Sequence, residues 1–426
     1  MKVKNLILGA GPSGIGAGIA LGKDATVLEM ANDIGGLSMS ITIQGAIFDY
    51  GGHSFHTPHP EVRDLVFNNV EMFEQTRNAT CFSSGEVIPY PFQKNYKLLS
   101  AKNVVQECEE GLANISAKEK DFPNFEEFIK AKFGPGITKH FMLPYNQKLW
   151  GRDLKRMTSD WTAERVAAPE GIKEKFETIS GSRKPLQADT VVAYPAKGGF
   201  GEIFVQLGKK LHDIRFKSKV VRVEPNEKKV YTSDGNVYEY DNLISTLPIT
   251  DFLKLIPGVS EELVQSSNEL DFLSMKLGLV VVNHPVDTPI QRFYSAEEHI
   301  AAHKIAINHN SSDYLRSLPT HGIMLEISEG PEKKLIRPDM EQWIVDSLLA
   351  VGAIKSLSEV AHVEVRNVKY SYPVPTHNRT VIMDKIKNWL LEYNIHTIGR
   401  FGEWAYINSD KAIFKGLIKG YELAGN

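Results

Sequence analysis

A glycine-rich turn near the amino end of the chain constrains its fold more than any other feature. Gly9, Gly11 and Gly14 follow a short apolar run and open a stretch that is typical of a helix. A second apolar run, residues 25–28, ends at the acidic residue Glu29, and Gly36 closes a glycine pair soon after. Such glycines let the backbone approach a pyrophosphate at a helix amino terminus, and an acid at the next strand tip can bind a ribose diol. The sequence therefore predicts a Rossmann-type dinucleotide site within an α/β fold.

Length and charge narrow the class of protein. A chain of 426 residues predicts two or three domains, and a formal net charge of −3 gives no general attraction to nucleic acid or to an anionic membrane. Local basic residues must therefore hold any anionic ligand. Cys81 and Cys108 have no metal or redox spacing and are expected to be free thiols in a reducing compartment. No stretch is apolar for long enough to span a bilayer, so we expect a cytoplasmic protein.

The order of strand and helix patterns predicts three units. Residues 1–95, 186–250 and 366–426 are expected to form one discontinuous nucleotide-binding domain, joined by a linker near 181–185. Residues 96–185 are predicted to be helical and to cover a ligand. Within them, Asn124 and Glu127 resemble a capping box, and 134–136, Gly-Pro-Gly, should end that helix. Residues 251–365 are β-rich and predict a mainly antiparallel sheet that serves the substrate.

Three histidines near residue 55 allow two interpretations. His53, His56 and His59 are spaced three apart, which is compatible with a metal site. Metal-binding histidines usually stand on a rigid element with a further ligand, whereas Pro58 and Pro60 break any helix here. We therefore expect no metal. A histidine directly after the Gly-Gly pair at 51–52 can instead lie close to a cofactor.

Other motifs also have a structural and a functional interpretation. The run 198–201, Gly-Gly-Phe-Gly, is either a turn before a helix or a close approach to a planar cofactor. Arg400 is either a surface residue or a partner for negative charge near the last helix. The aromatic and amide residues at 90–93 and 144–150 either fill a core or stack on a base and read its edge. Arg165 is by default an exposed partner of an acid.

Taken together, these segments resemble the flavin-dependent UDP-galactopyranose mutases, within the wider group that includes monoamine and protoporphyrinogen oxidases. The likeness runs through most of the chain in the same order. The glycine turn and the segment 399–406 are typical of the whole flavin group, whereas Tyr-Pro-Phe-Gln, Pro-Tyr-Asn and Tyr-Pro-x-Pro-Thr are more specific to the mutases. The likeness is densest in residues 9–14, 48–53, 89–93, 143–165, 372–376 and 399–406.

The resemblance implies FAD rather than NAD, and it assigns residues to each part of the site. Glu29 would bind the adenosine ribose, Val220 would lie near the adenine, and His53 would lie against the isoalloxazine. Four residues match those that hold the uridine: Phe92, Gln93, Asn146 and Trp150. Four match those that bind the diphosphate: Arg165, Tyr294, Tyr372 and Tyr406. The implied cofactor-binding residues are Gly9, Gly11, Gly14, Glu29, Gly36, Val220, Gly399, Arg400 and Asp410.

The resemblance also implies a reaction. A mutase of this type interconverts the pyranose and furanose forms of a UDP-sugar, as expected in polysaccharide biosynthesis, with N5 of reduced FAD as the nucleophile on the anomeric carbon. NAD(P)H or another reductant would keep the cofactor reduced. The implied catalytic residues are His53, Arg165 and Lys304, the two cations stabilising the leaving diphosphate.

Two departures from the mutase pattern leave the substrate open. Lys304 stands where the mutases carry a second arginine, and lysine lacks the bidentate fork that suits phosphate. His56 stands where some members carry an aromatic residue. An FAD-dependent oxidoreductase acting on a sugar nucleotide, an amine or another small substrate is therefore the main alternative, and a non-catalytic flavin-binding protein is a third.

Overall fold

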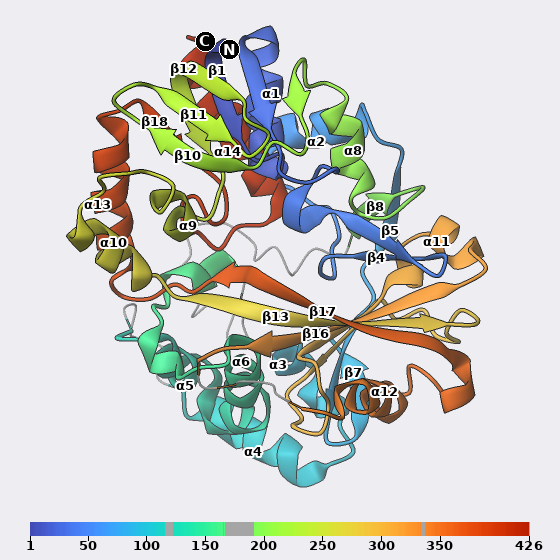
Figure 1. Ribbon diagram of the computed structural model, residues 1–426. Coiled ribbons are helices and arrows are strands. Elements are labelled where there is room, and N and C mark those ends of the chain that lie inside the picture. The colour runs from blue at the N-terminus through green and yellow to red at the C-terminus, as the bar shows by residue number, and fades with distance from the viewer. Residues whose placement is uncertain (116–121, 165, 167–190, 332, 334–336, 426) are drawn as a thin grey trace.

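The computed structural model describes residues 1–115, 122–164, 166, 191–331, 333 and 337–425. In Figure 1, the two chain ends lie together at one side of a first sheet, and the long strands of a second sheet cross the middle of the molecule. Helices α4, α5 and α6 lie beyond the second sheet. Within the described part of the chain, no helix combines the length and the hydropathy needed to cross a bilayer.

The first sheet is built on the glycine-rich turn. β1 (Lys2–Leu8) pairs in parallel with β2 (Ala25–Leu28) and with β12 (Val237–Ser245), and α1 (Pro12–Leu21) connects β1 to β2. The strand order is β10-β11-β12-β1-β2-β9, and β18 (Ile395–Thr397) pairs in parallel with β12. The predicted Rossmann-type α/β fold is confirmed. The remaining strands are β9 (Ile214–Arg215), β10 (Val220–Glu224) and β11 (Lys229–Thr232).

Glycines bring the last helix onto the first one. A methyl group on Gly16 of α1 would lie 2.4 Å from the Ile413 carbonyl oxygen, and one on Gly416 would lie 2.2 Å from the Ser13 carbonyl oxygen. Both glycines are therefore required for the close approach of α1 and α14 (Ser409–Ala424). This contact places α14 beside α1, the helix that follows the nucleotide turn (Figure 1).

The second sheet is antiparallel apart from one pair of strands. Its order is β17-β13-β16-β15-β14-β6-β7, and β14 runs parallel to β6. β6 and β7 come from residues 79–89, within the predicted first stretch of the nucleotide domain, yet they pair here; the division into three domains stays a prediction. The strands are β6 (Ala79–Ser83), β7 (Glu86–Pro89), β13 (Phe272–Val282), β14 (Arg292–Ser295), β15 (Lys304–Ile307), β16 (His321–Glu329) and β17 (Val360–Pro373).

A helical block packs through an aromatic core that also buries the free thiols of Cys81 and Cys108. Asn124 caps α5 by accepting a hydrogen bond from the Glu127 backbone N–H, which is one half of the predicted capping box. The helix is interrupted at Gly134, as predicted, because that residue has non-helical backbone angles, and a second helical segment follows it to Ile137. Gly134 adopts a φ of 67°, which a glycine permits, and packs against the backbone of α4 at Gly111. The helices are α3 (Phe92–Asn95), α4 (Lys102–Ala113), α5 (Phe125–Ile137) and α6 (Leu143–Trp150).

Two small sheets and the remaining α-helices complete the fold. Two two-stranded antiparallel sheets pair β3 (Ser40–Ile43) with β4 (Ala46–Asp49) and β5 (Met72–Thr76) with β8 (Val191–Pro195). The other helices are α2 (Pro60–Phe67), α8 (Glu202–Gly208), α9 (Ile249–Leu253), α10 (Glu261–Asn268), α11 (Asp313–Ser317), α12 (Met340–Ala350) and α13 (Arg379–Leu391).

Candidate active site

The nucleotide turn has the shape that a dinucleotide needs. Glu29 follows β2, and its carboxylate accepts hydrogen bonds from the backbone N–H groups of Ala10 (2.9 Å) and Ala31 (2.8 Å). The Gly35 N–H binds the Ala10 carbonyl oxygen, so the second glycine pair lies against the first turn. No described atom lies within 4 Å of a methyl group placed on Gly11 at the start of α1. This open space at a helix amino terminus fits a pyrophosphate.

The residue predicted to lie near the adenine, Val220, is close to the same turn. The Ser218 backbone N–H donates to the Glu29 carbonyl oxygen at 2.9 Å, which brings the start of β10 beside the acid. Val220, the first residue of β10, is buried there. Gly399 adopts a φ of 87°, and a methyl group on it would lie 2.8 Å from the Ser13 hydroxyl oxygen. Two distant chain segments thus meet at the amino end of α1.

Arg400 and Asp410 lie where α14 begins. The Arg400 Nε donates to the Ile407 carbonyl oxygen at 2.9 Å, and its guanidinium carbon lies 5.2 Å from the centre of the Tyr372 ring. Asp410 is buried in the first turn of α14, and both residues line the main cavity. Arg400 is therefore not the surface residue of the simpler interpretation.

Phe200, in the glycine-rich turn at 198–201, packs against the ring of His53. The backbone N–H of Phe200 donates to the buried carboxylate of Asp49 at 2.8 Å, and α8 begins at Glu202. The ring of Phe200 stacks on His53 with 4.7 Å between ring centres. A methyl group on Gly199 would lie 2.3 Å from the Ser40 hydroxyl oxygen, so the close approach in the structure is to β3. The turn thereby fixes the plane of the His53 ring.

One cavity of about 240 Å³ lies between the two sheets and the helical block. It brings together predicted residues from both the cofactor and the substrate sets. Its lining includes His53, Gln93, Asn146, Tyr294, Lys304, Tyr372, Arg400, Tyr406 and Asp410.

Two residues assigned to the uridine lie behind the wall of this cavity. Phe92 is fully buried and stacks on Phe141 with 4.7 Å between ring centres. Trp150 is also buried, at 5.5 Å from the centre of the Tyr406 ring. Both pack the core that holds the lining side chains in place. Their assigned contact with a uridine stays a prediction, and Arg165 lies outside the described residues.

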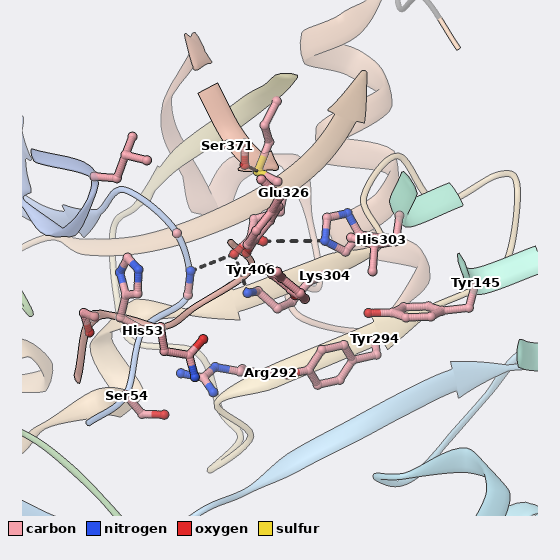
Figure 2. Close-up of a pocket in the computed structure, with 18 of the residues that line it drawn as sticks. His53, Ser54, Tyr145, Arg292, Tyr294, His303, Lys304, Glu326, Ser371 and Tyr406 are labelled. Atoms are coloured by element: carbon pink, nitrogen blue, oxygen red, sulfur yellow. Dashed lines mark hydrogen bonds and ion pairs between the residues drawn. The ribbon is translucent and has the colours of Figure 1, made fainter. Parts of the chain in front are cut away.

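A buried carboxylate, Glu326, organises the centre of the cavity (Figure 2). Its Oε1 lies 2.6 Å from the Lys304 ammonium nitrogen and accepts a hydrogen bond from the Gly52 backbone N–H at 2.7 Å. Its Oε2 lies 3.5 Å from Nε2 of His303. Burial alone would raise the pKa of Glu326, but Lys304 and His303 outweigh it and hold that pKa well below its usual range. Lys304 is therefore paired within the protein and anchors the turn that carries His53.

Arg77 and Arg292 are cavity residues that the sequence analysis did not find. Arg292 lies on β14 two positions before Tyr294, so both side chains share one face of the strand. Arg77 donates a hydrogen bond to the Tyr294 hydroxyl at 3.1 Å. Burial would raise the pKa of Tyr294, yet Arg77, Arg292 and Lys304 together lower it. Arg292 could have been predicted from the sequence, because a residue two positions before Tyr294 on a strand points to the same face.

Three histidines withdrawn from water predict a loss of stability in acid, His303 and His309 being buried and His53 half-buried. Burial lowers the pKa of His53 and of His309 to about 3 and that of His303 to about 4, from an ordinary value of 6.5. The unfolded chain therefore binds more protons than the folded chain below about pH 6.5, so the free energy of unfolding falls as pH falls. We expect a decrease of up to about 1.4 kcal/mol per pH unit for each such histidine.

Urea unfolding at intervals from pH 7 to pH 4.5 measures this decrease. His309→Asn should make the slope shallower, because it removes one proton-binding group from the unfolded chain. His284→Asn, on a side chain that is 58% exposed, is the matched control. Equal slopes in the wild type and in His309→Asn would contradict the prediction.

One protein family and several solved structures match this chain over most of its length. The family described as flavin containing amine oxidoreductase matches residues 17–289. A solved structure of reduced UDP-galactopyranose mutase superposes with a TM-score of 0.89 and 25% sequence identity, covering 100% of this chain and 94% of that one.

More distant solved structures share the fold. A putative protoporphyrinogen oxidase from Exiguobacterium sp. 255-15 has a TM-score of 0.76 at 14% identity, covering 100% of this chain and 99% of that one. Putrescine oxidase bound to putrescine has a TM-score of 0.68 at 16% identity, covering 100% of both chains.

Proposed function

Because the chain belongs to the family of flavin containing amine oxidoreductases, with FAD as its cofactor, we propose that it is an FAD-dependent sugar-nucleotide mutase. Its substrate would be a UDP-sugar, whose pyranose and furanose forms it interconverts. The full-length similarity to UDP-galactopyranose mutase supports this choice within the family. The overall change is an isomerisation, so atoms and electrons balance without a second substrate.

The observation that carries the proposal is the charge of the cavity lining. Arg77, Arg292, Lys304 and Arg400 contribute guanidinium and ammonium groups, whereas the lining carboxylates among the described residues are Glu326 and Asp410. Tyr294, Tyr372 and Tyr406 add hydroxyl groups. A lining of this kind attracts a diphosphate and repels a protonated amine, which disfavours an amine oxidase.

Reduced FAD would supply the nucleophilic nitrogen that the exchange at the anomeric carbon needs. The side chains would position the substrate and stabilise charge. His53 is held by Phe200 and by the Gly52–Glu326 hydrogen bond. Its pKa of about 3 keeps it neutral near pH 7, so it can pack against a flavin ring without adding charge. The tyrosine hydroxyls and the arginines of the lining would stabilise the diphosphate as the anomeric bond breaks.

A comparison of oxidised and reduced enzyme tests the proposal. We expect UDP-galactopyranose to be converted to UDP-galactofuranose, and the reverse, only after dithionite or NADPH has reduced the flavin. Chromatography of the sugar nucleotides follows the product. Turnover with oxidised flavin and oxygen, with peroxide formed, would instead support the oxidoreductase. A reduced enzyme that leaves both sugars unchanged would contradict the mutase for this substrate.

A further inference from the structure

Arg77, Tyr294 and Arg292 form one group in the cavity wall, which we call the arginine–tyrosine cluster. Arg292 and Tyr294 extend from the same face of β14, and Arg77 reaches them from the connection between β5 and β6. The Arg77 guanidinium donates to the Tyr294 hydroxyl at 3.1 Å, and the Tyr294 ring lies 4.7 Å from the Tyr90 ring. The cluster is therefore held in place on both sides, and Figure 2 shows Arg292 and Tyr294 beside Lys304.

The positive charge of Arg292 acts on carboxylates that already have other partners. Two carboxylates whose charge acts on Arg292 are Glu326 and Asp49. Glu326 pairs with Lys304 and accepts from Gly52, and Asp49 accepts hydrogen bonds from Ser40, Tyr194 and Phe200. No ion pair among the described residues includes Arg292. Arg292 is half-buried in the cavity wall, and a cation partly withdrawn from water without a close anion favours an anionic ligand at this place.

Lys304 is poorly placed to bind the same anionic ligand. Its ammonium group is 2.6 Å from Glu326, its side chain is 13% exposed, and its Cε would lie 3.0 Å from a methyl group on Gly52. Its position is therefore set by Glu326 and by the turn before His53. Arg292 stands on the neighbouring strand, where it pairs in register with Ala306 of β15. A guanidinium there offers the bidentate fork that a lysine lacks.

We propose that the arginine–tyrosine cluster, rather than Lys304, binds an oxyanion of the substrate, an inference that rests on the proposed function. Two planar guanidinium groups and a phenol hydroxyl suit the diphosphate of a sugar nucleotide. The carboxylate of an acidic sugar has the same recognition chemistry. In the first case the cluster replaces the arginine that the mutase pattern expects at residue 304. In the second it selects a uronic-acid sugar.

Binding titrations of the holoenzyme separate these cases, with UDP, uridine and pyrophosphate as probes and calorimetry as the readout. Arg292→Met should weaken UDP binding by roughly ten- to a hundredfold and leave uridine unchanged, because it removes charged hydrogen bonds to phosphate. Arg292→Lys should bind UDP more weakly than the wild type but more tightly than Arg292→Met. Arg63→Met, on a half-exposed side chain paired with Glu74, is the matched control. Lys304→Met should weaken UDP binding less than Arg292→Met does.

A second arm compares UDP-galacturonate with UDP-galactose. If Arg292→Met leaves UDP unchanged but weakens only the uronate, the cluster holds the sugar carboxylate. If the wild type binds neither UDP nor a UDP-sugar, the proposed function fails, and pyrophosphate then tests the cluster alone: binding lost in Arg292→Met supports it. Arg292→Met that binds all the probes as the wild type does would overturn the inference.

Discussion

Glu326→Ala should lower the free energy of unfolding by about 3–5 kcal/mol, because it leaves a buried ammonium group without its carboxylate. The Glu326 side chain is 1% exposed, and that of Lys304 is 13% exposed, so water cannot replace the lost partner fully. The substitution also removes the acceptor of the Gly52 N–H. Urea unfolding of the purified variant at pH 7 measures the loss.

Two further variants identify the cause of that loss. Glu326→Gln keeps an oxygen for the Gly52 N–H but removes the charge, so it should be less harmful than alanine. The double variant Glu326→Leu with Lys304→Met removes both buried charges and should recover part of the stability. Additive losses in the double variant would contradict the argument, because they would mean that the two side chains stabilise the protein independently. Flavin absorbance should also shift in Glu326→Ala if the Gly52 hydrogen bond positions His53.

Local patterns in the sequence predicted the parts of the fold that local forces decide. The first strand, α1 and β2 follow from apolar runs and glycine spacing, and the cap at Asn124 follows from its hydrogen-bonding side chain. The kink at Gly134 was predicted as a helix end. The stop signal was real, but contact between that glycine and Gly111 of α4 lets a helix resume beyond it. Such a contact depends on tertiary packing.

Strand register explains why only part of the site could be predicted from local sequence patterns. Lys304 and Glu326 are register partners on β15 and β16, twenty-two positions apart in the chain, and nothing local specifies that pairing. Position 304 could therefore be identified as cationic from the sequence, but not as paired. Arg292 could have been placed by its spacing from Tyr294. Arg77 could not, because it reaches the cavity through the parallel pairing of β6 with β14.

Gly14→Ala should prevent stable folding of the nucleotide turn, whereas Gly11→Ala should leave the fold intact and remove FAD. A methyl group on Gly14 would lie 1.9 Å from the carbonyl oxygen of Gly9, and backbone atoms on both sides cannot move aside cheaply. We therefore expect little soluble Gly14→Ala protein, or a markedly lower melting temperature for it. Gly11 has extended backbone angles that any residue adopts, and no described atom lies within 4 Å of its added methyl group.

The contrast between these two neighbours tests the cofactor site directly. The space beside Gly11 is the one that we assign to the pyrophosphate, so the methyl group of Gly11→Ala should weaken FAD binding by about 1–3 kcal/mol, or roughly ten- to a hundredfold. Apo-protein circular dichroism and melting temperature should match the wild type, while reconstitution followed by flavin absorbance should fail at FAD concentrations that saturate the wild type. Wild-type FAD affinity in Gly11→Ala would mean that the pyrophosphate does not approach the amino end of α1, and the proposed position of FAD would then be wrong.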